Sequence, residues 1–145
     1  MKVHLFAIAL LIGSNAAALP AEKVLKFKSV NFYMDVKNGE YHYMGVTVFP
    51  DGGIGTKDYF EKRGANGADS GHSTYYFANG TIEATFTGTA VGTNGGHYKG
   101  QYAIVSGTGD YQGATGTGTI DGVYGDASPL KNAILLDIEL DLKTP

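Results

Sequence analysis

The sequence predicts an all-β protein built as one eight-stranded antiparallel β-barrel. Two stretches, Thr81–Val91 and Leu136–Leu142, alternate between apolar and polar residues, and a period of two is typical of a strand with one buried face. Turn signals such as Asn79-Gly80 recur along the chain, and this dipeptide is a strong hairpin signal. No amphipathic helical pattern follows the N-terminal region. Antiparallel strands joined by short turns are therefore expected throughout.

The turn signals divide the chain into eight expected strands, which is the number in the smallest common barrel. A barrel of this size encloses room for one small ligand. The polar segment Gly64–Gly71 is expected to be a loop. A β-bulge near Ser29 is expected, because the apolar residues of the first strand change phase there. The expected strands are Val24–Asp35, Glu40–Phe49, Ile54–Arg63, Ser73–Phe77, Thr81–Val91, His97–Val105, Tyr111–Asp121 and Leu130–Leu142.

Composition excludes several function classes. The formal charge is −3 and the basic residues form no patch, so a nucleic-acid partner has no electrostatic basis. The chain has no Cys, which removes thiolate nucleophiles and Cys-type metal centres. His42, His72 and His97 lack the spacing of a local metal site. We therefore expect no metal, no cofactor and no membrane span.

The N-terminal segment has the pattern of a secretory signal peptide. Lys2 supplies the positive charge, Leu5–Ile12 is a short apolar run, and Ala16–Ala18 fits the cleavage rule. We expect residues 1–18 to be removed, with Ala21 as the alternative cleavage point, and residues 19–145 to form the barrel domain. The protein is then secreted and extracellular.

The acidic residues fall into two groups. Asp137, Glu139 and Asp141 alternate with leucine and isoleucine, so they are expected on a solvated outer face. Asp35 instead ends an aromatic and apolar stretch, where a carboxyl group can serve as a general acid or base. It is a candidate catalytic residue together with Tyr33. The competing interpretation is a strand-end carboxylate that caps the next turn.

Aromatic residues are plentiful, with 10 Tyr and 7 Phe. Core packing is their default role, but a ring that faces a lumen can also stack on a ligand. The expected ligand-binding residues are Tyr41, Tyr43, Tyr76, Phe86 and Tyr102.

Asn79-Gly80-Thr81 forms a glycosylation sequon at an expected hairpin turn. Asn79 is therefore a candidate glycosylation site, unless these residues serve only as the turn.

Two stretches resemble the dirigent proteins and the related allene oxide cyclases. Phe32-Tyr33-Met34-Asp35-Val36, followed by Asn38-Gly39, resembles the dirigent opening strand FYFHDI, although it is one residue shorter and lacks the His. Ile104–Gly116 resembles the dirigent run VVGGTGxFRxARG and the cyclase run LAVTGGSGIFEG. Gln112 and Thr115 stand where the dirigent run has arginines, and the cyclase's strand-one Glu falls near Phe32. The similarity extends in order from about Val24 to Leu142.

This resemblance implies a calycin-like barrel that binds a hydrophobic or phenolic molecule and directs its cyclisation or stereoselective coupling without a cofactor. It also implies a homodimer or homotrimer, and it places Asp35 where dirigent proteins have their Asp. Two other functions stay open: a non-catalytic, lipocalin-like carrier or effector, and a structural secreted protein.

Overall fold

The computed structural model describes residues 21–92 and 94–145. The expected signal peptide, residues 1–18, lies outside these ranges. The described chain forms eight strands and two single turns of 3-10 helix, at Ala65–Gly67 and Gly109–Tyr111. The strands are β1 (Ala21–Lys37), β2 (Glu40–Val48), β3 (Ile54–Arg63), β4 (Ala68–Phe77), β5 (Gly80–Val91), β6 (Gly95–Gly107), β7 (Thr115–Gly125) and β8 (Ile134–Thr144).

The strands close into one antiparallel barrel, as predicted. Each strand pairs with its neighbour in sequence, and β8 pairs with β1 to complete the ring. In the closing pair, Leu25 lies opposite Leu140 and Asn31 lies opposite Ile134. Closure gives every strand a neighbour on both sides, so the barrel has no edge strand of the kind that an open sheet exposes.

The predicted alternation of inward and outward residues is confirmed in β5 and β8. Ile82, Ala84 and Phe86 are buried in β5, as are the leucine and isoleucine residues at 136, 138, 140 and 142 in β8. Asp137 and Glu139 are exposed on the outer face, where they pair with Lys28 and Lys26 of β1. These carboxylates are thus the solvated outer face that the sequence predicted.

The predicted bulge in β1 is displaced. The register with β2 shifts between Tyr33 and Asp35, not near Ser29. Ser29 and Asn31 remain on the buried side of β1, while Val30 and Phe32 face outward. Asn31 has 0% exposure and its Nδ2 donates to the Ile134 carbonyl oxygen at 3.2 Å. The apparent change of phase therefore reflects polar residues inside the barrel and apolar residues outside it.

Strand β4 begins at Ala68, so the second half of the expected loop Gly64–Gly71 is strand. Its residues pair with the end of β3, with Arg63 opposite Asp69. The connection is a single 3-10 turn, closed by a hydrogen bond from the Gly64 N–H to the Ala68 carbonyl. The sequence suggested a loop because these residues are small and polar. In the structure they are small and polar because they lie at the rim of the barrel.

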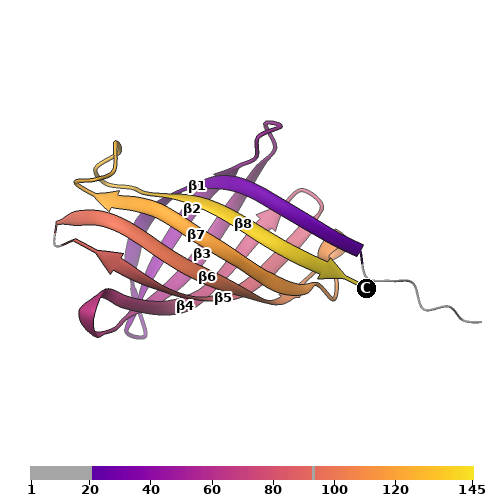
Figure 1. Cartoon of the computed structure of the whole chain (residues 1–145), viewed down its shortest axis with the longest axis horizontal. Coiled ribbons are helices and arrows are strands. Elements are labelled where there is room, and N and C mark those ends of the chain that lie inside the picture. Colours follow the sequence, from indigo (N-terminus) through magenta and orange to yellow (C-terminus); the bar gives the residue numbers. More distant parts are fainter. Residues whose placement is uncertain (1–20, 93) are drawn as a thin grey trace, which may run out of the picture.

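The two ends of the barrel carry different connections (Figure 1). The β1–β2, β3–β4, β5–β6 and β7–β8 connections lie at one end, and the chain leaves β8 at the other. No helix in the described ranges is long and apolar enough to span a membrane.

Candidate functional site

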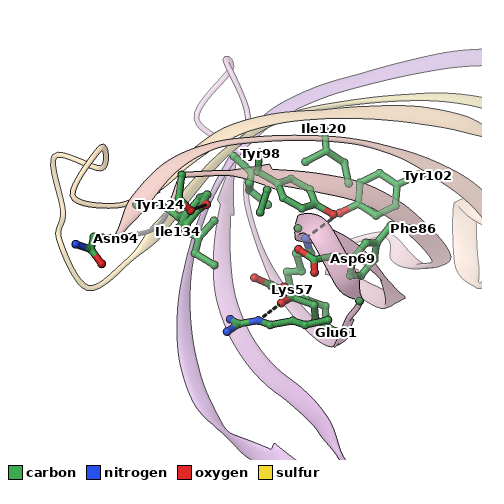
Figure 2. Close-up of a pocket in the computed structure, with 18 residues that line it drawn as sticks. Lys57, Glu61, Asp69, Phe86, Asn94, Tyr98, Tyr102, Ile120, Tyr124 and Ile134 are labelled. Carbon is green, nitrogen blue, oxygen red and sulfur yellow. Dashed lines mark hydrogen bonds and ion pairs between the residues drawn. The ribbon is translucent and has the colours of Figure 1, made fainter.

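A cavity of about 470 Å³ opens at the end of the barrel that carries the β3–β4 and β5–β6 connections. Its volume lies in the range of small-molecule sites, about 300–1,000 Å³. Figure 2 shows aromatic, aliphatic and charged side chains around it. The lining residues are Lys57, Tyr59, Glu61, Arg63, Gly64, Gly67, Asp69, Phe86, Ala90, Gly92, Asn94, Gly95, Tyr98, Tyr102, Ile120, Tyr124, Ile134 and Leu136.

The other end of the barrel is filled by aromatic rings. Phe27 lies 5.0 Å from Phe49, 5.3 Å from Tyr75 and 5.7 Å from Phe77, measured between ring centroids. Phe77 also contacts Tyr111 at 5.8 Å. These separations are typical of favourable aromatic pairs. These rings do not line the cavity but fill the barrel beneath it, so the lumen is a pocket open at one end.

Lys57 of β3 lies at the bottom of this pocket and is 2% exposed. Its Nζ donates to the Tyr102 hydroxyl at 2.9 Å. The amine also lies 4.3 Å from the Tyr59 ring centroid and 5.3 Å from that of Tyr75. Among residues 21–92 and 94–145, no carboxylate oxygen lies within 4.0 Å of this amine. Lys57 is thus a buried amine enclosed by tyrosine side chains.

The contacts of Lys57 offset only part of the cost of burying a cation. Removing an ammonium group from water costs several kcal/mol even after the protein relaxes, while a cation–π contact contributes about 0.5–2 kcal/mol. Such a group is retained at a stability cost unless an anion joins it. The amine therefore marks the pocket floor as a site that favours a negatively charged group.

Burial holds the hydroxyls of three tyrosines in or beside the cavity, Tyr43, Tyr59 and Tyr98, in their neutral, hydrogen-bond-donating form. Burial raises the pKa of Tyr59 well above its ordinary value, and burial also raises the pKa of Tyr98. The pKa of Tyr43 rises to about 12, first through burial and then through the negative charge of Glu61. Tyr98 is buried, and its hydroxyl has no hydrogen-bond partner within the described part of the chain.

The rim of the cavity carries a group of ionisable side chains. Arg63 donates to Glu61 Oε1 at 2.7 Å and to the Tyr43 hydroxyl at 2.6 Å. Asp69 lies opposite Arg63 in the β3–β4 register. The pKa of Asp69 rises to about 6, because burial disfavours its charge and Glu61 repels it, although Arg63 acts in the opposite direction. The rim therefore changes charge in mildly acidic solution.

The structure places two of the predicted ligand-binding residues in the cavity wall. Phe86 of β5 and Tyr102 of β6 both line it, with ring centroids 6.0 Å apart. Tyr43 is buried and stacks on Tyr59 at 4.7 Å. Tyr41 lies under the Arg63 guanidinium, whose carbon is 3.9 Å from the ring centroid. These tyrosines support the cavity rim without lining the cavity itself.

Tyr76 lies outside the lumen, contrary to expectation. It is 47% exposed and occupies the outward side of β4, between the inward residues Tyr75 and Phe77. Adjacent residues of a strand point to opposite faces of the sheet. Because residues 75 and 76 are both tyrosine, residue type alone does not show which one points inward. Tyr75 is the inward residue of the pair.

Asp35 is also outside the lumen, and this corrects its expected role. The shift in register after Tyr33 places Asp35 opposite His42, on the outer face. Its side chain is 51% exposed, and Oδ1 lies 3.0 Å from His42 Nδ1. Tyr33 remains near the rim, where its ring is 5.7 Å from that of Tyr43. Asp35 and Tyr33 therefore do not meet in a pocket, and Asp35 cannot reach a molecule in the lumen.

His42 instead organises a cluster on the outer face of β2, β3 and β4. Its Nε2 lies 2.6 Å from Asp58 Oδ1, so each ring nitrogen contacts a carboxylate. The imidazole stacks on Phe60 at 4.5 Å, and Phe60 stacks on His72 at 5.0 Å. The cluster joins side chains on the outer face of neighbouring strands, and none of its members lines the cavity.

Lys57, Glu61, Arg63 and Asp69 were not predicted as site residues. In β3 both faces mix polar and apolar residues, so alternation alone does not show which face is inward. Pairing of the β2–β3 hairpin supplies the missing information, since it places Tyr43 opposite Tyr59. Lys57 and Glu61 are two residues from Tyr59 on either side, and therefore share its inward face.

Asn79 lies in the β4–β5 turn and is exposed, as predicted for this hairpin. Its Nδ2 donates to Asp110 Oδ2 at 2.8 Å, and its Oδ1 accepts from the Tyr111 hydroxyl at 3.2 Å. The side chain thus links two turns at the closed end of the barrel. Glycosylation of Asn79 stays a prediction.

A second hollow of about 470 Å³ lies on the outer face, lined by residues of β1, β7, β8 and the β2–β3 connection. The ion pairs Lys26–Glu139 and Lys28–Asp137 border it. Phe27, Phe49 and Ile138 give this hollow apolar surface, but it is more open to solvent than the lumen, and small-molecule sites usually enclose most of the ligand. The lumen is therefore the candidate functional site.

Comparison with known proteins identifies no relative of this chain. A scan against protein-family models found no match, and neither curated proteins nor solved structures yielded a significant one.

Proposed function

We propose that this protein is a secreted barrel that binds one small hydrophobic or phenolic molecule in its lumen. The observation that carries the proposal is the pocket of about 470 Å³, closed below by aromatic rings and open at one end of the barrel. Phe86, Ile120 and Leu136 supply apolar wall, and release of water from such surface favours binding. The lumen is also more enclosed than the hollow on the outer face.

The second candidate function is cofactor-free cyclisation or stereoselective coupling of the bound molecule. The resemblance of Phe32–Val36 and Ile104–Gly116 to dirigent proteins and allene oxide cyclases supports it. Neutral tyrosine hydroxyls and the Lys57 amine provide fixed donors that can orient an oxygen-bearing substrate away from water. Any proton transfer in the lumen falls to these groups or to the carboxyl groups of Glu61 and Asp69, because Asp35 lies outside.

The binding function is tested by obstructing the pocket. Ala90 points into the cavity near its rim, whereas Ala103 of β6 is exposed on the outer face. Native mass spectrometry of the purified protein should detect a retained small molecule, and the neutral dye N-phenyl-1-naphthylamine should bind. Ala90→Trp should remove the retained molecule and weaken dye binding by at least about tenfold, equivalent to about 1.4 kcal/mol.

Ala103→Trp is the matched control and should bind as the parent does. Equal binding by the two tryptophan variants would place the ligand outside the lumen, and a parent that binds neither a retained molecule nor the dye would overturn the proposed function.

A further inference from the structure

Three side chains that line the cavity, those of Lys57, Tyr102 and Tyr98, are hydrogen-bond donors. Lys57 Nζ has three N–H bonds, of which one is directed to the Tyr102 oxygen. Because the Tyr102 oxygen accepts from the amine, its own O–H is available to another acceptor. Tyr98 lies opposite Ala90 near the rim, and its buried hydroxyl reaches inward to Gly88 without a hydrogen-bond partner among the described residues. Figure 2 shows the rings of Tyr98 and Tyr102 projecting into the cavity above Lys57. A ligand group placed here must accept several hydrogen bonds.

No negative charge of the described chain serves these donors. Glu61 also lines the cavity, but its Oε1 is engaged by Arg63 at 2.7 Å. Asp69 lies at the rim, opposite Arg63 in the strand register. Neither carboxylate lies within 4.0 Å of Lys57 Nζ. The Lys57 amine therefore has no negatively charged partner in the described chain, and an anionic ligand would supply one.

The upper part of the cavity has a different character. Phe86, Ile120, Ile134 and Leu136 form apolar wall between the floor and the rim. An apolar body fits against this wall, and its charged end fits against the donors below it. Arg63 at the rim is already paired with Glu61, so the donors that remain to hold the anionic end of a ligand lie below this apolar wall.

We infer that the lumen binds a hydrophobic organic anion, with a carboxylate or comparable oxyanion seated on Lys57, Tyr102 and Tyr98 and the apolar body directed toward the rim. This inference rests on the proposed function and specifies the class of ligand. The oxyanion supplies the counter-charge that Lys57 lacks and accepts from the unpartnered Tyr98 hydroxyl. Hydrogen bonds to charged groups are stronger than neutral ones, so the charged end accounts for much of the selectivity.

A matched pair of dyes tests the inference. 8-Anilinonaphthalene-1-sulfonate and N-phenyl-1-naphthylamine share one ring system, and only the first carries a sulfonate. Fluorescence titration measures the dissociation constant of each for the parent and for Lys57→Met, which keeps the length of the side chain and removes its charge. Lys62→Met is the control, because Lys62 lies on the exposed outer side of the same strand.

Lys57→Met should weaken the sulfonate dye by about 10- to 100-fold, the range expected for loss of a charged hydrogen bond. The neutral dye should change by less than about twofold, and Lys62→Met should leave both dyes unchanged. Equal effects of Lys57→Met on the two dyes, or no effect on either, would overturn the anion assignment while leaving lumen binding intact. Failure of the parent to bind either dye would overturn the proposed function as well.

Tyr98→Phe provides a second test that does not depend on folding of the lysine variant. The substitution removes only the unpartnered hydroxyl. It should weaken the sulfonate dye by about three- to tenfold, the cost of one hydrogen bond, with no loss for the neutral dye. Unchanged binding of the sulfonate dye by Tyr98→Phe would remove Tyr98 from the site. Unchanged binding by both variants would exclude the oxyanion seat.

Discussion

The two ends of the barrel use the same eight strands for different purposes. At the closed end, Phe27, Phe49, Phe77 and Tyr111 fill the space between the strands with aromatic contacts. At the open end, a cavity remains and ionisable side chains gather around it. The difference indicates that the closed end supplies most of the packing energy. At the open end the cavity leaves side chains without packing partners, and Lys57 is buried. Both features lower the stability of the fold and favour ligand binding.

The largest expected effect follows from truncating the closed end. Phe27→Ala should lower the free energy of unfolding by about 3–5 kcal/mol, because it leaves a void among tightly packed rings. Phe86→Ala, at the cavity wall, should cost less, about 2–3 kcal/mol, since part of its ring already borders open space. Urea denaturation monitored by circular dichroism measures both. An equal or larger loss for Phe86→Ala would show that the two ends contribute equally to stability.

An intermediate effect is expected from Asp69 at the open end. Its pKa is about 6 in the folded protein against an ordinary value of 3.8, so between these values the folded chain binds a proton that the unfolded chain does not. Stability from this group is therefore present at low pH and is lost as the pH rises through about 6. Asp69→Asn should stabilise the protein by about 1 kcal/mol at pH 7.5, a value reduced for partial solvent exposure, and by almost nothing at pH 4.

The control for Asp69 is Asp141→Asn, on the exposed outer side of β8. Thermal unfolding at the two pH values should reveal no comparable gap for this variant. A pH-independent effect of Asp69→Asn would show that its charge does not penalise the folded state.

The smallest effect is expected from Asp35, which belongs to neither end of the lumen. Asp35→Asn should change the free energy of unfolding by less than about 1 kcal/mol, because its carboxylate is half exposed and His42 keeps its contact with Asp58. Binding of N-phenyl-1-naphthylamine should stay within about twofold of the parent, and Asp137→Asn should behave in the same way. If Asp35→Asn weakened dye binding tenfold and Asp137→Asn did not, Asp35 would have to be part of the binding site.

The sequence sufficed to predict the barrel because its turns and two of its strands follow simple rules. Asn79-Gly80 marks a hairpin, and β5 and β8 alternate without interruption. Secretion and the dirigent-like resemblance stay predictions.

The inward face was harder to predict where the barrel interior is polar. In β1, Asn31 fits inside because Gly45 lies opposite it, and a Cβ at Gly45 would come within 2.4 Å of Asn31 Oδ1. Because Val30 and Phe32 are apolar, the sequence pattern predicted that they point inward, but both face outward. The position of Asp35 depended on a one-residue change of register, which local sequence does not specify.

The position of the connections at the two ends of the barrel also affects how such a barrel can diversify. Each connection at the open end joins two strands that are adjacent in sequence, as in β3–β4 and β5–β6. Insertions or exchanges within one of these loops alter the entrance without touching the aromatic layer at the far end. Loop tips tolerate such changes well. A barrel of this kind could thus acquire new ligands through changes in one loop at a time, while the aromatic layer at the closed end keeps its packing.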